Sequence, residues 1–221
     1  MLAVKSLSFS FEHRRLFQDV SFEVPPGTLL HLQGVNGVGK STFLGILAGI
    51  RKQDNGTIEY IDQNQKRYTD IREVSAYLSA EANGLYTKMD AIGNLRFWCQ
   101  LRGLKPSNAE LVGSMETWGL GHPLLRQNFP VEFFSTGMRR RLALARLSLA
   151  QASCWLLDEP IYGLDEKGIN LFRQHLEKHL DGGGVGVMIS HDRLASKGIK
   201  TLDYLLKGRV QSIKTDEKGD S

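Results

Sequence analysis

Cysteine is scarce in this sequence, and long apolar runs are missing. Its 221 residues include two cysteines, Cys99 and Cys154, which have apolar neighbours and no metal-site spacing. We expect two reduced, buried thiols and no disulfide, as in a cytosolic protein. No signal peptide is evident, and no apolar stretch approaches the roughly 18 residues of a membrane-spanning helix. We therefore expect any membrane role to depend on separate partner chains.

The chain also has no strong excess of one charge. Its net charge is +4, and the 24% of charged residues include both signs along the whole length. A mixed surface of this kind does not indicate nucleic-acid binding. The arginines at 139–141 would suggest such a patch in isolation, but we interpret them as solvated or paired within their own helix. Since 41% of the residues are hydrophobic, the chain can bury a full core as a single domain, 1–221.

The hydrophobic pattern predicts an α/β fold in which strands alternate with helices. Residues 40–50 have helical periodicity, with Phe43, Leu44 and Leu47 facing inward. Short apolar strands of the kind found here are typical of a parallel sheet covered by helices. The predicted strands cover residues 2–9, 20–24, 28–34, 75–80, 154–158 and 185–190.

Between the strands lies a predicted helical subdomain, at about 85–150, inserted in the core of the fold. Two sets of apolar residues there repeat at helical spacing: Ile92, Leu95 and Cys99, then Leu111, Met115 and Trp118. Near the C-terminus, residues 203–213 read as a hairpin that turns at Lys207 and Gly208, followed by a charged, mobile tail at 214–221.

The segment "GVNGVGKS" matches the phosphate-binding pattern G-x-x-x-x-G-K-[ST] completely. Because it follows a predicted strand and opens a predicted helix, its backbone N–H groups would face a polyphosphate. Lys40 would contact the β- and γ-phosphates, Ser41 would bind Mg²⁺, and Thr42 would support the turn. Packing alone gives no reason for a lysine and a hydroxyl at these offsets. The predicted nucleotide-binding residues are Gly34, Val35, Asn36, Gly37, Val38, Gly39, Lys40, Ser41 and Thr42.

Two carboxylates follow the predicted core strand in "CWLLDEP". Asp158 ends the strand, where it would hold Mg²⁺ beside the phosphate-binding loop. Glu159 points elsewhere, and it would polarise the water that attacks the γ-phosphate. A lone "DEP" is often no more than two solvated carboxylates at a helix start, but the complete phosphate-binding loop favours the catalytic interpretation.

With these residues assembled, the chain resembles the nucleotide-binding subunits of ABC transporters over nearly its full length. That family has a Leu-Ser-Gly-Gly-Gln signature shortly before the magnesium aspartate, and here Phe134–Met138 occupies this place. The resemblance implies that ATP is held between two copies of the chain in a homodimer. Ser135 and the Gly137 amide would complete the γ-phosphate site of the other copy, assisted by the helix dipole.

The resemblance also assigns further positions. His191 looks like the switch histidine that contacts the γ-phosphate, and Asp165, in "YGLD", looks like the D-loop aspartate that acts across the dimer. Gly163 stands there in place of a commoner alanine. Phe11 takes the place of the aromatic residue that stacks on adenine, although Phe17 is close by in the sequence and either one could instead belong to the core.

Three positions depart from the family pattern. Thr136 replaces the first signature glycine and Met138 replaces the glutamine, so both weaken the signature. Glu81 stands where many relatives have a glutamine that touches Mg²⁺ and the attacking water. Its carboxylate could still coordinate Mg²⁺ or accept a hydrogen bond from water, but its charge would repel the γ-phosphate. These changes predict an ATPase that is slow or depends on its partners.

The segments 83–104 and 133–160 are similar to the ATP-binding subunit of the haem exporter in bacterial cytochrome c maturation. Asn94, Trp98 and Trp155 are among the residues that match this family most closely. This resemblance implies integral membrane partners, a place on the cytoplasmic face of the inner membrane, and ATP-driven release of a haem-loaded chaperone. We expect a partner helix to dock in a groove between the ATPase core and the helical insertion, around Glu81, Leu85, Tyr86 and Phe97. The alternatives are the ATPase of another small exporter, for drugs or lipids, and a soluble ABC ATPase that acts on nucleic acid or ribosomes.

Overall fold

In the computed structural model, strands alternate with helices along the chain. The structure describes residues 1–12, 14–80, 84–126, 129–190, 198–206 and 212–214. The chain divides into two compact units. Unit 1 consists of Met1–Tyr77, Ala152–Asp158 and Glu177–Ser221, and unit 2 of Leu78–Gln151 and Glu159–Leu176. The sequence-based limits of the helical subdomain, 85–150, stay a prediction.

The first sheet of unit 1 is antiparallel around β1, in the order β2-β1-β4-β5. In β2, the buried residues Val20, Phe22 and Val24 alternate with exposed ones, so one face of the strand covers the core. The strands expected at 2–9 and 20–24 are therefore confirmed and are longer than predicted. The sequence analysis missed β4 and β5. The four strands are β1 (Leu2–Phe11), β2 (Arg14–Val24), β4 (Asn55–Ile61) and β5 (Arg67–Tyr68).

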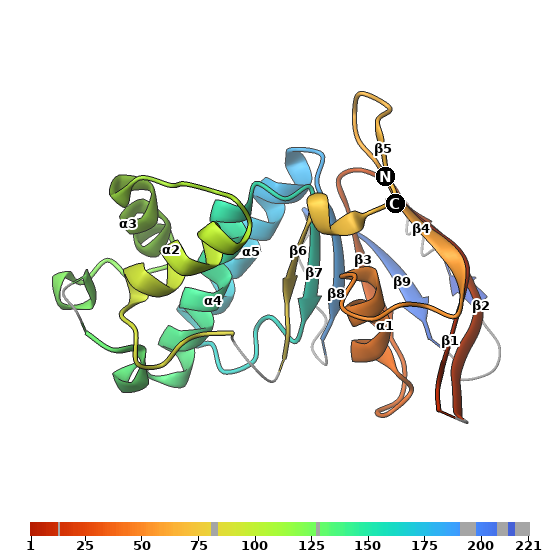
Figure 1. Cartoon of the computed structure of the whole chain (residues 1–221), viewed down its shortest axis with the longest axis horizontal. Coiled ribbons are helices and arrows are strands. Elements are labelled where there is room, and N and C mark those ends of the chain that lie inside the picture. The colour runs from red at the N-terminus through yellow and green to blue at the C-terminus, as the bar shows by residue number, and fades with distance from the viewer. Residues whose placement is uncertain (13, 81–83, 127–128, 191–197, 207–211, 215–221) are drawn as a thin grey trace, which may run out of the picture. The chain divides into compact units, whose positions relative to one another are not determined.

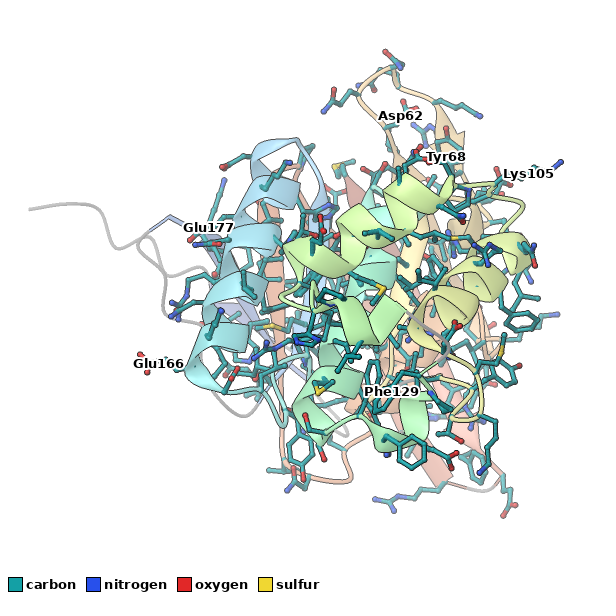
Figure 2. The ribbon with its side chains drawn as sticks, turned by 90° about the vertical axis from the view of Figure 1, so that its left-hand side faces the viewer. Asp62, Tyr68, Lys105, Phe129, Glu166 and Glu177 are labelled. Atoms are coloured by element: carbon teal, nitrogen blue, oxygen red, sulfur yellow. The ribbon has the colours of Figure 1, made fainter. Side chains whose placement is uncertain are left out.

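Asp62 closes the turn between β4 and β5 (Figure 2). Its Oδ1 accepts hydrogen bonds from the N–H groups of Asn64 at 2.8 Å and Lys66 at 2.9 Å. The Tyr68 hydroxyl donates to Oδ2 of the same carboxylate at 3.4 Å. An aspartate that bonds to the backbone two residues further on is a common way to stabilise a turn.

The second sheet has the order β10-β9-β3-β8-β7-β6. Strand β3 runs parallel to β8 and β9, β7 runs parallel to β8, and β10 pairs antiparallel with β9. All residues of β7 and β8 are buried, as the apolar sequences predict. The strands expected at 28–34, 75–80, 154–158 and 185–190 are confirmed. Their observed bounds, with those of the last two strands, are β3 (Thr28–Gln33), β6 (Ser75–Leu78), β7 (Cys154–Asp158), β8 (Val185–Ile189), β9 (Lys200–Leu205) and β10 (Ser212–Lys214).

The predicted C-terminal hairpin is formed by β9 and β10, in which Ser212 lies opposite Leu205. Its expected turn at Lys207 and Gly208 lies outside the described residues, as do residues 215–221. Lys214 was assigned to the tail from the sequence, but it belongs to β10 and lies opposite Asp203 of β9.

The core of unit 1 joins both sheets to helix α1 (Lys40–Leu47), which packs against β7 and β8. Phe43, Leu44 and Leu47 are fully buried, as predicted. The Phe43 ring meets that of Phe17 edge to face, with centroids 5.1 Å apart. This packing fixes the helix that follows the phosphate-binding loop.

Helices dominate unit 2, where α2 and α3 both pack against α4 (Figure 1). Leu95, Cys99, Leu111, Met115 and Trp118 are fully buried, as their spacing predicts, whereas Ile92 is half-buried. Side chains mark where the first two helices begin. The Asp90 carboxylate caps α2, and Ser107 forms a capping box with Glu110 at α3. The helices are α2 (Ala91–Leu101), α3 (Asn108–Thr117), α4 (Thr136–Ala150) and α5 (Glu166–Asp181), which ends in unit 1.

Candidate nucleotide-binding site

The phosphate-binding loop joins β3 to α1, as the sequence predicts. Gly34, Gly37 and Gly39 have φ values of +149°, +77° and +104°, which side chains rarely adopt. A Cβ at Gly34 would also lie 2.8 Å from the carbonyl oxygen of Leu206. The three glycines are thus required by the loop itself. Helix α1 begins after Gly39, and no side chain among the described residues caps it, so its first N–H groups can face an anion.

Lys40 places its ammonium group within this loop. Its Nζ donates to the carbonyl oxygens of Gly34 at 2.7 Å and Val35 at 3.3 Å. The Val35 side chain is 75% exposed, and residues 36 and 37 are also exposed. A positive charge and free backbone donors therefore lie together at an accessible loop, which is an arrangement suited to polyphosphate.

Ser41 and Asp158 are the residues expected to hold Mg²⁺. Ser41 is exposed in the first turn of α1, whereas Asp158 ends β7 and is 3% exposed. Hydroxyl and carboxylate oxygens are the ligands that Mg²⁺ prefers. The two residues therefore fit the ion. Glu81, the third expected ligand, lies outside the described residues.

Glu159 belongs to unit 2 and has an unusual backbone. Its φ is +47°, in the left-handed region that residues other than glycine seldom occupy. Its carbonyl oxygen accepts hydrogen bonds from the Tyr162 N–H at 3.1 Å and from Nη2 of Arg140 at 2.6 Å. Such backbone conformations persist only where the surroundings enforce them, and they concentrate at functional sites.

Ser135 is the N-cap of α4, and its Oγ accepts a hydrogen bond from the Met138 N–H at 3.2 Å. The hydroxyl hydrogen can still be donated to an anion. Gly137 lies in the first turn of the helix, where a Cβ would be 3.1 Å from the Gly163 carbonyl oxygen. The helix therefore begins with an exposed hydroxyl and a glycine, as the resemblance requires of a signature.

Thr136 packs against Gly163, so two departures from the family pattern meet. A Cβ built at Gly163 would lie 3.1 Å from the Cγ2 methyl of Thr136. Gly163 also has a φ of +77°. An alanine at 163 and a threonine at 136 therefore compete for the same space.

Asp165 has a structural role within the chain. Its Oδ1 accepts a hydrogen bond from the Gly168 N–H at 2.8 Å, which stabilises the start of α5, and it also pairs with Arg141. The Gly168 bond and then the arginine lower the pKa of this carboxyl group. Its proposed action across a dimer remains a prediction.

The arginines at 139–141 contradict the interpretation made from the sequence, because they are not simply solvated or paired within their helix. Arg139 donates to the Glu132 carbonyl oxygen at 2.7 Å. Arg140 is 3% exposed and donates to carbonyl groups beyond the helix, and Arg141 pairs with Asp165. The arginine side chains in the first turns of α4 reach segments outside the helix and bind oxygen atoms there.

The remaining predicted site residues give a mixed outcome. Phe17 is fully buried in the core, and therefore cannot stack on a base, whereas Phe11 is 51% exposed at the end of β1. Its contact with adenine remains a prediction. His191 lies outside the described residues.

A polar network beneath the phosphate-binding loop was missed from the sequence. His31 is 5% exposed in β3, and its Nε2 donates to the Ser190 carbonyl oxygen at 3.0 Å. Gln33, which precedes the loop, donates to Asp203 at 2.8 Å. The signal for this network was a histidine within the otherwise apolar strand "TLLHLQ".

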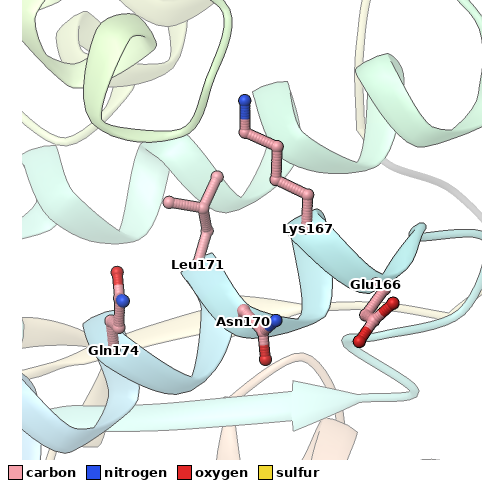
Figure 3. Close-up of a pocket in the computed structure, with 5 residues that line it drawn as sticks. All are labelled: Glu166, Lys167, Asn170, Leu171 and Gln174. Carbon is pink, nitrogen blue, oxygen red and sulfur yellow. The ribbon is translucent and has the colours of Figure 1, made fainter.

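A shallow pocket along α5 contains none of the predicted site residues. Figure 3 shows its lining, which comes from this one helix: Glu166, Lys167, Asn170, Leu171 and Gln174.

Within the described part of the chain, no helix is both long and apolar enough to cross a membrane.

Comparison with known proteins agrees with this geometry. The family model described as ABC transporter matches residues 17–162. The chain belongs to the ABC transporter family. A solved ATP-binding subunit of an ABC transporter superimposes with a TM-score of 0.81 at 26% identity, covering 98% of this chain and 90% of the other. A dimeric ATP-binding cassette bound to ADP and Pi, in a post-hydrolysis state, gives a TM-score of 0.78 at 20% identity, covering 97% of this chain and 98% of the other. The second likeness concerns the fold alone.

Among its curated relatives within the ABC transporter family are proteins named cytochrome c biogenesis ATP-binding export protein CcmA. The one from Xanthomonas campestris is 37% identical over 91% of this chain and 91% of its own length. That from Nitrosomonas europaea is 35% identical over 93% and 95%. That from Vibrio parahaemolyticus is 31% identical over 86% and 92%.

Proposed function

We propose that this chain is the ATP-binding and ATP-hydrolysing subunit of the ABC exporter that serves cytochrome c biogenesis, with haem as the exported or released species. The observation that carries this proposal is the complete phosphate-binding loop, with the Lys40 ammonium inside it, in a chain that aligns with CcmA proteins over more than nine tenths of its length.

Polyphosphate binding would use unit 1. The N–H groups at the start of α1 and the Lys40 ammonium would bind the β- and γ-phosphates, and Phe11 would stack on adenine. When bound, Mg²⁺ would neutralise charge on these phosphates, held by Ser41 and Asp158, with Glu81 as a further proposed ligand. Lys40 would exchange its bonds with neutral carbonyl groups for stronger bonds with an anion.

Water activation and closure would use other residues. Glu159 would accept a proton from the attacking water, and His191 would contact the γ-phosphate. Ser135 and the Gly137 amide would bind the nucleotide held by a second copy, with Asp165 nearby in the interface. Nucleotide would thus join two copies, and hydrolysis would release them.

Integral membrane subunits on separate chains are the proposed partners, which would place this subunit on the cytoplasmic face of the bacterial inner membrane. Tyr86 supports this as a docking point. It is 54% exposed, its ring meets Phe97 edge to face at 4.9 Å, and its backbone exchanges hydrogen bonds with the buried Asn94 side chain. An exposed aromatic ring held this firmly is a suitable anchor for a partner helix.

Two substitutions test the enzymatic part of the proposal. Lys40→Ala should abolish ATP binding because it removes the loop's cation. Glu159→Gln should retain binding but lower hydrolysis by roughly 100-fold or more, since it removes the proposed base. Nucleotide binding would be measured by fluorescence and hydrolysis by phosphate release. Light scattering should show that the Glu159→Gln chain accumulates as an ATP-bound dimer.

Lys52→Ala and Glu166→Gln are matched controls, because both replace exposed residues outside the proposed site. Hydrolysis by Glu159→Gln at the wild-type rate would refute the catalytic assignment. The transport assignment is tested separately, by deleting the gene in its host. Continued assembly of c-type cytochromes would exclude it without affecting the ATPase result.

A further inference from the structure

We propose that Arg140 is a positioning residue that holds the backbone of Glu159 in the conformation needed for hydrolysis. The inference rests on the proposed function only in taking Glu159 as the residue that activates water. Its structural part depends on contacts within unit 2 alone.

The reason a holding residue is needed lies in the Glu159 backbone. With φ at +47°, Glu159 occupies a region where its Cβ crowds its own main chain. The peptide would relax toward an ordinary conformation if nothing opposed it, and the side chain would then change direction. The Tyr162 N–H donates to the Glu159 carbonyl oxygen at 3.1 Å and so contributes to holding this turn.

Arg140 restrains this backbone with a buried side chain. Its Nη2 donates to the Glu159 carbonyl oxygen at 2.6 Å, and its Nε donates to the next carbonyl, that of Pro160, at 3.0 Å. Two successive carbonyl groups bound by one planar, rigid guanidinium define the direction of the peptide between them. A third donor, Nη1, binds the carbonyl oxygen of Ser79 at 2.9 Å and so ties the group to a second segment.

Burial makes these bonds strong. Arg140 is 3% exposed and Pro160 is also buried, so water cannot replace the guanidinium at low cost. Hydrogen bonds from a charged donor are stronger than neutral ones, and a low-dielectric environment strengthens them further. The adjacent arginines act elsewhere: Arg139 binds Val131 and Glu132 carbonyl oxygens, and Arg141 pairs with Asp165.

The test compares Arg140→Gln and Arg140→Lys with Arg139→Gln in the full chain, and with the membrane subunits where these are needed for turnover. Arg140→Gln should lower kcat by roughly 10- to 100-fold, with KM for ATP unchanged within about twofold, because only the water-activating group is misplaced. Arg140→Lys should recover part of kcat, since an ammonium can bind some of the same carbonyl groups. Arg139→Gln should resemble wild type.

Hydrogen exchange provides a readout that does not need activity. Amides in residues 159–165, which include the bonded N–H groups of Tyr162 and Leu164, should exchange faster in Arg140→Gln and at the wild-type rate in Arg139→Gln. If Arg140→Gln fails to fold, Arg140→Lys carries both measurements and should show an intermediate exchange rate.

Unchanged exchange in the Arg140 variants overturns the proposal, and so does a change in KM without a change in kcat. If Glu159→Gln hydrolyses ATP normally, the proposed role of Glu159 fails instead, while the exchange result still decides whether Arg140 holds this backbone.

Discussion

Replacing Gly163 with alanine tests the contact between the start of α4 and the loop that follows Glu159. The new methyl group would lie 3.1 Å from the Thr136 Cγ2, closer than carbon atoms normally approach. The same substitution puts a side chain on a backbone with φ at +77°. The substitution therefore has two separate costs, one from the close contact with Thr136 and one from the backbone conformation, and the two can be measured separately.

The backbone penalty is about 1–2 kcal/mol for a residue with a Cβ in the left-handed region. Overpacking typically costs a further 1–3 kcal/mol, and the lower end applies here because Thr136 is exposed and can shift. We therefore expect Gly163→Ala to reduce the free energy of unfolding by about 2–3 kcal/mol. Thr136→Ser removes the Cγ2 methyl and retains the hydroxyl, so it should relieve about 1 kcal/mol of this cost.

A double-mutant cycle measures the contact. Urea unfolding would be followed by tryptophan fluorescence for wild type, Gly163→Ala, Thr136→Ser and the double variant. Gly103→Ala is the matched control: Gly103 lies in unit 2 with φ at +71°, and a Cβ there would have no neighbour within 4 Å. It should show the backbone penalty alone, with no response to Thr136→Ser.

Two results would refute this reasoning. The first is a cost for Gly163→Ala no larger than that for Gly103→Ala. The second is additivity of Gly163→Ala and Thr136→Ser within about 0.5 kcal/mol, which would mean that the two side chains do not interact.

Two further predictions concern stability and docking. Burial lowers the pKa of His179 from 6.5 to about 4, although its hydrogen bond to Val185 acts in the opposite direction. As the pH falls, the imidazole takes up a proton near pH 6.5 in the unfolded chain but only near pH 4 in the folded chain. The contribution of neutral His179 to the free energy of unfolding is therefore complete above pH 6.5 and is lost as the pH falls toward 4. Between pH 7.5 and 5, the His179 contribution to the free energy of unfolding should fall by about 2 kcal/mol. Urea titrations of His179→Phe should lack this loss. An equally steep fall in the variant would contradict the role of His179. Tyr86→Ala should weaken recovery of the chain with its membrane subunits without changing ATP affinity, and equal recovery would exclude Tyr86 as an anchor.

The parts of the fold that could be predicted are those with short-range causes. Strands β7 and β8 are apolar at nearly every position because both faces are buried, and this pattern is visible in five consecutive residues. The phosphate-binding loop was predicted because its glycines, lysine and hydroxyl are local requirements of one turn. In β4, by contrast, Ile58 and Tyr60 are buried between exposed or half-buried residues. With Ile61, the strand has three apolar residues, which are too few to distinguish a strand from a loop.

Arg140 could not have been understood in the same way. Its carbonyl partners are 19, 20 and 61 positions away in the sequence. A sequence pattern indicates which residues are neighbours three or four positions apart on a helix. Contacts of that range do not include the carbonyl partners of Arg140, so three consecutive arginines were interpreted as a solvated surface. The left-handed backbone of Glu159 is equally invisible, because no glycine or asparagine marks it.

Contacts within each unit hold the proposed site residues of that unit. In unit 1, backbone carbonyl groups already orient the Lys40 ammonium, and the packing of α1 fixes the N–H groups beside it. In unit 2, Arg140 and the Ser135 cap hold the Glu159 loop and the start of α4. Neither half then has to be ordered at the expense of binding energy. Under the proposed function, that energy would be available for drawing two copies of the chain together and so for changing the shape of the membrane partners.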